Sequence, residues 1–577
     1  MRRTKIICTI GPASESPEKV QQLLAAGMNV ARLNFSHGTH ADHGSRIAVL
    51  REEAGKLGSH LGILLDTKGP EIRTTMVPEN GITLANGAVF TLDTNQALGS
   101  SERVGITYQD LWRDVVPGTH ILIDDGQIDL EVTSVQPEEI RTIVRNGGLL
   151  KSQKGVNVPG VSIKLPGLSE KDVADIRFGI SQGIDYIAAS FTRKAADILE
   201  VRRLVEEMGA SVEIIAKIES KEGIDNLDSI LEVADGIMVA RGDLGVEVPV
   251  EEVPVYQKEM IKKCNVLGKA VIVATQMLDS MIRQPRPTRA EASDVANAIV
   301  DGADAIMLSG ETAAGQFPVE AVCMMDKIAR RTEATLLETR EIHQPHLNVA
   351  ESISHASCKI AKDLGATAIL TPTQSGLTAR MISKYRPQSL IVAATPYPEV
   401  ARKLALHWGI VPLLVPESSG TDQLLSEAVQ AALGQNYIQT GDLVVITAGV
   451  PVGKVGTTNL IKVQVVGRTL AKGSGIGRKS YQGTARVIRF PGEETFNTGD
   501  ILVTSYTDAS FVPLIARAGA LVVQEAGLTS HAAILAIEYG IPAVTGIAEV
   551  VTKIRDGQTI TVDALAGVVH EGSVNIL

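Results

Sequence analysis

The sequence predicts an α/β protein that begins with a (β/α)₈ TIM barrel, and three observations lead to this fold class. The chain has 577 residues, which is too long for one core and suggests about four domains. Short apolar runs alternate with helical patterns through residues 1–310, and such alternation implies parallel strands. Eight of these runs match the strand number of a closed barrel. A doubly wound open sheet has the same alternation and remains the structural alternative.

Each predicted strand of the barrel is a short apolar run. The helical pattern Ser16–Gly27 starts with a capping serine and Pro17 and ends on glycine, and Arg193–Gly209 and Val250–Gly268 are similar. The eight strand candidates are Lys5–Ile10, Asn29–Phe35, Gly62–Asp66, Ile184–Phe191, Glu213–Ile218, Gly236–Ala240, Ala270–Thr275 and Ala305–Ser309.

One long segment, Thr74–Leu165, interrupts the alternation after the third strand. Its β-rich stretches Gly81–Thr94, His120–Val135 and Glu139–Val144 are joined through Asn-Gly and Asp-Gly turns. We expect an inserted small β-barrel domain at 71–168, between barrel segments 1–70 and 169–345. Since it hangs on two neighbouring linkers, it can close over the barrel mouth as a lid.

A further α/β region follows a polar stretch near Glu338–Leu347. We expect an open α/β domain at 346–472. Its predicted strands are Ala366–Thr371, Ser389–Thr395, Ile410–Val415, Leu443–Ala448 and Ile461–Val466. Ala471–Gly477 has three glycines and a serine, which predicts a linker. The remaining 478–577 is long enough to fold as an extra domain.

Composition narrows the class of protein. Hydrophobic residues make up 44% and charged residues 21%, which is enough apolar material for several cores. The net charge of -11 argues against a nucleic-acid partner held by general basicity. The four cysteines, Cys8, Cys264, Cys323 and Cys358, form no Cys-x-x-Cys pair and fit free thiols in a reducing compartment. With no signal peptide and no membrane-spanning run, we expect a cytoplasmic protein.

Polar residues follow nearly every predicted barrel strand, at the face where barrel enzymes carry their function. In the second strand, Arg32, Asn34 and Ser36 share one face while Leu33 and Phe35 pack away. A structural ion pair would explain any single case. The set favours a site, because charges buried together must be paired or coordinate something. The other strand ends carry Asp66–Arg73, Lys217–Glu219, Ala240–Asp243, Thr275–Gln276 and Ser309–Glu311.

These residue types suit phosphoryl transfer. Glu219 and Asp243 are hard oxygen donors of the kind Mg²⁺ accepts together with substrate oxygens. Lys217 can neutralise charge on a phosphoryl group in flight. Arg32 and Arg73 offer forked donors for phosphate oxygens. Four further residues supply oxygen ligands for a monovalent cation, namely Asn34, Ser36, Asp66 and Thr67.

Nine stretches in family order resemble pyruvate kinase. They are Thr4–Gly11 (TKIICTIG), Met28–Gly38 (MNVARLNFSHG), Asp66–Thr74 (DTKGPEIRT), Lys154–Val161 (KGVNVPGV), Ala216–Gly223 (AKIESKEG), Met238–Glu247 (MVARGDLGVE), Ala274–Met281 (ATQMLDSM), Pro287–Gly302 (PTRAEASDVANAIVDG) and Ile306–Thr312 (IMLSGET). The resemblance implies transfer of the phosphoryl group of phosphoenolpyruvate to ADP, giving pyruvate and ATP in glycolysis.

The resemblance also implies roles for residues. Catalytic positions are Lys217, Arg32 and Thr275; substrate positions are Arg32, Lys217, Gly242, Asp243 and Thr275; nucleotide positions are Asn34, His37, Arg73 and Lys154; Mg²⁺ ligands are Glu219 and Asp243; K⁺ ligands are Asn34, Ser36, Asp66 and Thr67. Glu71 stands where K⁺-dependent members carry glutamate, so we expect K⁺ dependence. Thr275 and a water chain would protonate the enolate, with Ser309 and Glu311 behind them.

The α/β domain carries a loop between a strand and a helix that resembles the family's allosteric sugar-phosphate pocket. Hydroxyls, a glycine and a helix N-terminus suit phosphate, although a plain helix cap explains the same residues. The loop residues are Thr371, Thr373, Gln374, Ser375, Gly376 and Thr378. We expect an allosteric phosphorylated metabolite there. Pro287–Gly302 resembles the family's subunit-contact helix, so Arg289 and Asp294 would link a homotetramer.

The last segment departs from the common pattern. Gly499–Val569 resembles the mobile phosphohistidine domain of phosphoenolpyruvate-utilising enzymes, through Thr529–Ala533 and Gly540–Val544. His531 is therefore a candidate phosphohistidine. No ATP-grasp module is evident and Ala526 stands where a second glycine is usual, which favours an appendage with an idle histidine. A dikinase-like enzyme working through His531 and a metabolite sensor on a decayed barrel are the rival functions.

Overall fold

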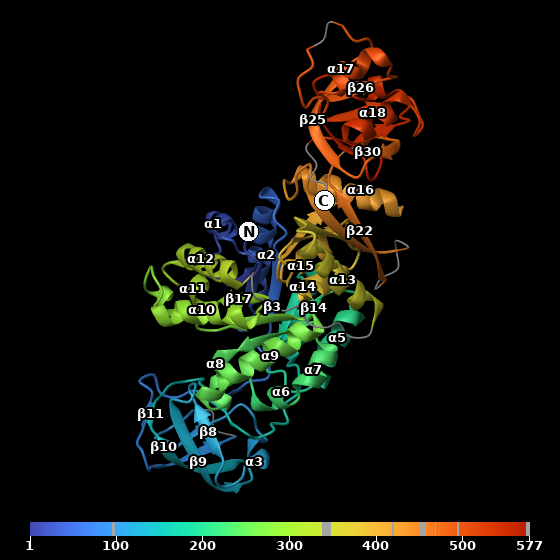
Figure 1. The fold of residues 1–577 in the computed structure, drawn as a ribbon. Helices are drawn as coiled ribbons and strands as arrows, with labels where there is room; N and C mark the ends of the chain where they lie inside the picture. The colour runs from blue at the N-terminus through green and yellow to red at the C-terminus, as the bar shows by residue number, and fades with distance from the viewer. Residues whose placement is uncertain are drawn as a thin grey trace. The chain divides into compact units, whose positions relative to one another are not determined.

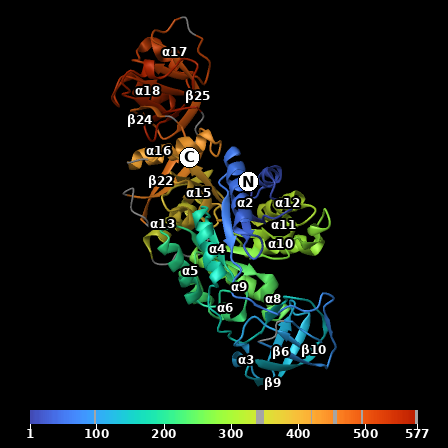
Figure 2. The same ribbon diagram turned by 180° about the vertical axis from the view of Figure 1, so that it is seen from behind.

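The computed structural model describes residues 1–94, 98–336, 348–417, 420–450, 457–467, 469–492 and 495–572 (Figures 1 and 2). The chain divides into two compact units. The first comprises Met1–His343, Ser383–Arg386 and Tyr397–Pro412, and the second comprises Gln344–Ile382, Pro387–Pro396 and Leu413–Leu577. The polar stretch near Glu338–Leu347 lies outside the described residues. No helix in the described ranges is long and apolar enough to cross a membrane.

The first unit is built on a closed barrel of eight parallel strands, as predicted. The open-sheet alternative is excluded, because β1 pairs with both β2 and β17 and so closes the sheet. The order around the barrel is β1-β17-β16-β15-β14-β13-β3-β2. The strands are β1 (Lys5–Thr9), β2 (Val30–Asn34), β3 (Gly62–Asp66), β13 (Tyr186–Ala189), β14 (Glu213–Ile218), β15 (Gly236–Ala240), β16 (Ala270–Ala274) and β17 (Ala305–Leu308).

Residues along each barrel strand alternate between two hydrophobic clusters. In β1, Ile6 and Cys8 belong to the large cluster that includes the surrounding helices, whereas Ile7 belongs to the smaller cluster of inward-facing residues. Such alternation is what a strand with both faces buried requires. Leu406 joins the inner cluster from α15 and its C-terminal flank (α15, Pro398–Leu404), so a segment distant in sequence packs into this barrel.

Helices surround the barrel and begin and end where the sequence places caps. Ser16 caps α1 through Lys19 N–H, and Gly27 ends it in the left-handed region at φ 115°, as predicted. The barrel helices are α1 (Pro17–Ala26), α2 (His40–Lys56), α4 (Glu170–Ser181), α5 (Ala195–Glu207), α6 (Lys221–Asp225), α7 (Leu227–Val233), α8 (Arg241–Glu247), α9 (Val253–Leu267), α10 (Arg289–Asp301), α11 (Gly310–Ala313) and α12 (Pro318–Leu336).

The insert leaves the barrel after β3 and returns before α4, and it is all-β apart from α3 (Leu111–Asp114). Its strands form a seven-stranded sheet, β4-β12-β8-β9-β10-β6-β7, and a pair, β11-β5, around one hydrophobic core. They are β4 (Ile72–Arg73), β5 (Ile82–Leu84), β6 (Val89–Asp93), β7 (Arg103–Gly105), β8 (His120–Ile123), β9 (Ile128–Gln136), β10 (Glu139–Asn146), β11 (Gly148–Leu150) and β12 (Gly155–Asn157).

The α/β region that follows has the five predicted strands, in the order β20-β19-β18-β21-β22. Its last strand pairs antiparallel with β21 rather than parallel, because only residues 450–457 separate the two strands and a parallel crossover needs a dozen or more. The elements are α13 (Val349–Asp363), β18 (Ala368–Pro372), α14 (Leu377–Lys384), β19 (Leu390–Thr395), β20 (Ile410–Leu414), α16 (Thr421–Gly434), β21 (Leu443–Gly449) and β22 (Thr458–Val465).

The predicted linker Ala471–Gly477 was wrong, because these residues form strands of the last sheet. A Cβ added to Gly475 would collide with the carbonyl oxygen of Ala564, so this glycine allows close strand approach rather than flexibility. The sheet runs β23-β30-β29-β25-β26-β27-β28-β24. Its elements are β23 (Thr469–Lys472), β24 (Ser474–Ile476), β25 (Ser480–Val487), β26 (Ile501–Thr504), α17 (Val512–Ile515), β27 (Ala520–Val523), α18 (His531–Tyr539), β28 (Ala543–Thr545), α19 (Val550–Lys553), β29 (Thr559–Asp563) and β30 (Val568–Glu571).

Candidate active site

A cluster of charges lies at the C-terminal ends of β2, β3 and β14. Lys217 Nζ donates to Ser190 Oγ at 2.7 Å and pairs with Asp66 Oδ1 and Glu219 Oε1, both at 3.0 Å. Arg32 Nε donates to the other oxygen of Asp66 at 2.6 Å. Neighbouring parallel strands end at the same face, so residues far apart in sequence meet here. Four residues that the sequence analysis selected are thus brought together.

Charge balance explains the protonation states in this cluster. Burial alone would lower the pKa of Lys217, but the carboxylates of Asp66 and Glu219 outweigh it and raise the pKa above its ordinary value. Burial would raise the pKa of Asp66, but Arg32 and Lys217 hold it below its usual range. The lysine is therefore a fixed positive charge at neutral pH, and Asp66 a fixed negative one.

Asp243 lies in the first turn of α8, directly after the neighbouring strand β15, and it has no ion pair among the residues the structure describes. Its side chain opens toward solvent, yet the surrounding protein displaces enough water to raise its pKa to about 7, and the charge of Glu219 adds to the effect. Glu219 also accepts the Phe191 N–H at 2.6 Å. A carboxylate whose charged form is disfavoured by a neighbouring carboxylate forms, with that neighbour, a donor set that a divalent cation would stabilise.

The cation site that these residues offer is an open one. Among the described residues there is no group of three or more His, Cys, Asp and Glu side chains arranged to hold a metal ion. Glu219 and Asp243 would therefore be two protein ligands that leave other coordination positions to substrate oxygens and water, which suits Mg²⁺.

The residues expected to bind a monovalent cation include Asp66 of the cluster and residues next to it in the chain or across the strand pair. Asn34 is the register partner of Asp66 across β2 and β3, and Thr67 follows Asp66 in the chain. Asn34 Oδ1 accepts the Ser36 N–H at 3.1 Å, which holds this turn. All four side chains present oxygen, so their chemistry fits K⁺.

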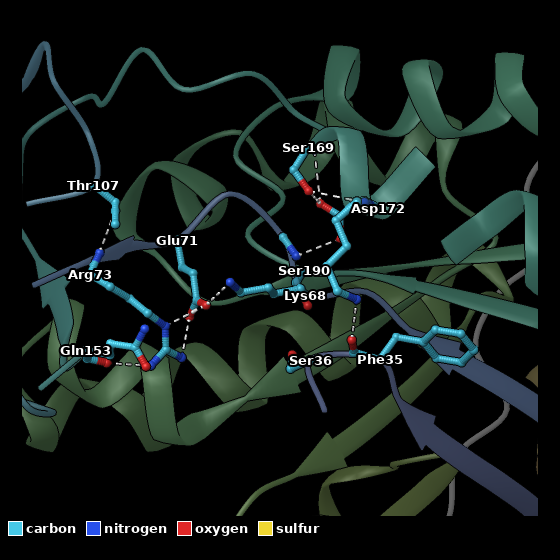
Figure 3. Close-up of polar contacts among 12 residues, drawn as sticks. Phe35, Ser36, Lys68, Glu71, Arg73, Thr107, Gln153, Ser169, Asp172 and Ser190 are labelled. Carbon is cyan, nitrogen blue, oxygen red and sulfur yellow. Dashed lines mark hydrogen bonds and ion pairs between the residues drawn. The ribbon is translucent and has the colours of Figure 1, made fainter. Parts of the chain in front are cut away.

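A cavity of about 540 Å³ lies beside this cluster, between the insert and the barrel, within the first unit. Its lining includes Glu71, Arg73 and Lys154 with Asp243. Glu71 is held by Arg73 at 2.7 Å and by Lys68 at 3.0 Å (Figure 3). Lys154 Nζ pairs with Asp124 at 2.8 Å. Asn34 and His37, also expected to bind nucleotide, are not among the residues that line it.

A second cavity, of about 750 Å³, shares Asp243 with the first and includes Gly242 and Thr275. Thr275 has φ 74°, which is a strained conformation for a β-branched residue and is typical of functional sites. A Cβ added to Gly242 would lie 2.8 Å from Thr275 Cγ2, so a larger residue here would force one of the two to shift. The three predicted substrate positions outside the charge cluster therefore surround one space.

Three further residues named in the sequence analysis, Glu311, Asp294 and Arg289, lie in surroundings that the structure describes. Glu311 accepts the backbone N–H of Leu278 and of Ser309, so it fixes the loop that Thr275 begins and the turn after β17. Asp294 pairs with Arg241 of the same chain at 2.6 Å, whereas Arg289 is exposed.

Ser190, whose hydroxyl lies between Lys217 and Asp66, was not predicted from the sequence. Its signal was available, since it is a polar residue near the end of the predicted strand Ile184–Phe191.

In the predicted effector loop of the second unit, three threonine hydroxyls already form hydrogen bonds within the protein. Thr371 Oγ1 donates to Val392 O, and Thr373 Oγ1 accepts the Gly376 N–H at 2.9 Å. Thr378 and Thr458 share a hydrogen bond at 2.8 Å. In the last domain, His531 opens α18 as predicted, and its Nδ1 lies 3.0 Å from Thr507 Oγ1.

Comparison with known proteins gives three family matches in chain order. Residues 1–322 match the barrel domain of pyruvate kinase, residues 351–464 its alpha/beta domain, and residues 496–567 the mobile domain of PEP-utilising enzymes. Proteins named pyruvate kinase match over the full length of both chains. One from Geobacillus stearothermophilus is 55% identical, one from Bacillus licheniformis 54%, and one from Staphylococcus aureus strain MRSA252 48%.

Proposed function

The chain belongs to the pyruvate kinase family, and we propose that it transfers the phosphoryl group of phosphoenolpyruvate to ADP, giving pyruvate and ATP in glycolysis. The observation that carries the proposal is the position of Lys217. Its ammonium group lies among Asp66, Glu219 and Ser190, at the mouth of the barrel and beside Asp243.

In the proposed reaction, the chain's own residues bind, orient and neutralise. The phosphoryl group in transit spreads negative charge over its oxygens, and Lys217 and Arg32 are the cations at this mouth that can stabilise it. Asp66 pairs with both, which fixes their side chains before substrate binds. Such preorganisation avoids the cost of moving charged groups during the reaction.

Two cations complete the proposal. Glu219 and Asp243 would hold Mg²⁺, and Asn34, Ser36, Asp66 and Thr67 would hold K⁺. Bound there, the cations would supply positive charge that draws phosphate and carboxylate oxygens together. Gly242 and Thr275 would place the three-carbon part of the substrate, and Thr275 would pass a proton toward its methylene carbon. Arg73 and Lys154 would contact ADP in the cavity beside Glu71, whereas Asn34 and His37, which do not line that cavity, stay predicted nucleotide contacts.

The test is ATP formation from phosphoenolpyruvate and ADP, with Mg²⁺ and K⁺ added or omitted in turn. We expect activity only when both cations are present. ATP formation at full rate without K⁺ would contradict the role assigned to Glu71 and the four oxygen ligands. A panel of sugar phosphates and nucleotides in the same assay tests the effector proposed for Thr371–Thr378.

The last domain and the assembly are separate proposals. We infer a homotetramer in which α10 contributes to subunit contacts, which sedimentation would test. The His531→Ala variant should form ATP at the wild-type rate, since the proposed reaction does not pass through this histidine. Complete loss of ATP formation would instead favour the dikinase-like reaction.

A further inference from the structure

Helices α2 and α4 both begin with a capping box whose N3 residue is an aspartate, and of these two aspartates only that of α4 also accepts a hydrogen bond from outside its helix. In α2, Asp42 Oδ2 accepts both the N–H and the hydroxyl of Thr39 at 2.8 Å. In α4, Asp172 Oδ2 accepts the N–H of Ser169 at 3.0 Å and its hydroxyl at 2.5 Å. Asp42 is exposed, whereas Asp172 is completely buried. A capping box requires only the bonds between the aspartate and the N-cap residue. The burial of Asp172 therefore needs another explanation.

The second oxygen of Asp172 supplies that explanation. Asp172 Oδ1 accepts the backbone N–H of Gly69 at 3.1 Å (Figure 3). Gly69 lies in the linker that leaves β3 for the insert, whereas α4 begins where the chain has returned from it. One buried carboxylate therefore connects the two linkers of the insert.

The linker around Gly69 is confined on its other side as well. Gly69 has φ 74°, and an added Cβ would lie 2.7 Å from Phe191 Cδ2 and 2.8 Å from Ser190 Cβ. Upstream, Thr67 N–H donates to Ala188 O, and Ser190 Oγ donates to Thr67 O at 2.6 Å. Up to Gly69 the linker is thus held by the barrel and by α4.

Beyond Gly69 the partners change. Arg73 N–H donates to Thr107 Oγ1 at 2.9 Å, and Arg73 Nη1 donates to Gln153 O at 2.7 Å, both in the insert (Figure 3). Between these two sets of contacts lie Pro70 and Glu71, which form part of the wall of the 540 Å³ cavity. The bond between Asp172 and Gly69 is the fixed point from which this wall extends.

We propose that Asp172 is a positioning residue for ADP. It touches no ligand; by holding Gly69 it sets the place of Pro70–Arg73 and so the shape of the nucleotide cavity. The inference rests on the proposed function, because it takes that cavity as the ADP site. It assigns to Asp172 a second role in addition to capping α4.

The Asp172→Ala variant tests the proposal through two measurements in the full-length protein. Calorimetric titration with MgADP should show a dissociation constant about tenfold higher than wild type, since one buried hydrogen bond is worth roughly 1 to 1.5 kcal/mol. In the assay, the KM for ADP should rise about tenfold, whereas the KM for phosphoenolpyruvate should stay within about twofold. Asp172→Asn retains an acceptor for Gly69 and should restore most of the ADP affinity.

Two control variants separate positioning from capping. Ser169→Ala removes the capping hydroxyl but leaves the bond to Gly69, and Asp42→Ala removes the matching cap of α2. Both should lower the midpoint of thermal unfolding, because each removes a helix cap, and both should bind ADP like wild type. If Asp172→Ala does not fold, Asp172→Ser replaces it, because a serine side chain is too short to reach Gly69.

The measurements distinguish failure of the role inferred for Asp172 from failure of the proposed function. Wild-type ADP affinity in Asp172→Ala or its serine substitute would overturn the inference, and so would an equal loss of affinity in Ser169→Ala. Failure of the wild-type protein to bind MgADP would instead overturn the proposed function.

Discussion

Both ends of the barrel carry several charged side chains, but they differ in whether those charges are all paired with other side chains. At the N-terminal end, Asp185 accepts from Arg51 at 2.7 Å and Arg402 at 2.8 Å. Asp304 pairs with Arg386 at 2.9 Å. At the C-terminal end, Asp243 has no ion pair in the part of the chain that the structure describes, and it faces two cavities. The carboxylates at the base are paired with arginine side chains, whereas Asp243 at the mouth is available to bind a ligand.

Burial of charge therefore does not by itself identify a functional site. The base carries buried ion pairs as the mouth does, but the segment Tyr397–Pro412 supplies a partner to one of them through Arg402, and Leu406 packs among the inward-facing residues of the strands. The base charges therefore serve stability, and the mouth charges serve chemistry. Variants at each end should separate these two roles.

The largest expected effect comes from matched substitutions of one lysine at each end. Lys217→Met at the mouth should lower kcat by at least about 10³-fold, since it removes a preorganised charge from the phosphoryl path. Lys5→Met at the base should leave kcat unchanged, because Lys5 Nζ donates to Ile410 O at 2.6 Å and lies at the end of the barrel opposite the mouth. Steady-state rates with circular dichroism as a fold control give the measurement. A similar loss of kcat in both variants would break the comparison.

Removing a base carboxylate should cost stability rather than activity. Asp304→Ala leaves the buried Arg386 guanidinium without its ion pair, which should lower the free energy of unfolding by about 3 kcal/mol. We place the loss at the lower end of the range for buried pairs, because Arg386 keeps hydrogen bonds to Asn265 and Gly302. Urea unfolding measures the loss, and kcat of the folded variant at low temperature should match wild type.

At the mouth, Gly242→Ala should cost activity with little loss of stability. The added methyl would press on Thr275 Cγ2, so Thr275 or the start of α8 must move. A displacement of this size at a reacting centre can lower kcat/KM by about 10²-fold. Assays with varied phosphoenolpyruvate measure the loss, and an unchanged kcat/KM would show that Thr275 has room to move.

The smallest effect is a pH dependence of stability at the base. Burial, with help from Arg2 and Arg3, lowers the pKa of Lys5 from 10.5 to about 7. Between pH 7 and pH 10.5 the unfolded chain therefore binds more protons at this residue than the folded protein does. Raising the pH through this window should stabilise wild type relative to Lys5→Met, by up to about 1.4 kcal/mol per pH unit. Thermal unfolding of both proteins at pH 7 and pH 9 measures the difference, and a constant difference would contradict it.

The barrel could be predicted from sequence because each strand is a local signal. Gly62–Asp66, Glu213–Ile218 and Gly236–Ala240 were predicted with the bounds that the structure gives them. Each is a continuous apolar run between helical patterns, which is typical of a parallel strand buried on both faces. The polar ends of these strands predicted the mouth for the same reason.

The closed base could not be predicted, because its partners are not local. Asp185 and Asp304 stand just before β13 and β17, where an acidic residue reads as an ordinary strand boundary. Only the fold brings Arg402 and Arg386 to them. The glycines around Gly475 led to the wrong prediction of a linker, because a glycine that allows close strand approach and a glycine in a flexible linker look the same in sequence. Asp172 likewise reads as a helix cap, and its bond to Gly69 is visible only in three dimensions.

The position of the insert has a consequence for how the chain folds. β3 and β13 are neighbours in the barrel, yet residues 67–185 lie between them in sequence. Closing so long a loop costs entropy and slows folding of proteins rich in distant contacts. An insert that folds first would bring its own two ends together and turn the long loop into a short one. On this view, the all-β insert is also a folding clamp, and the barrel should close only after the insert has formed.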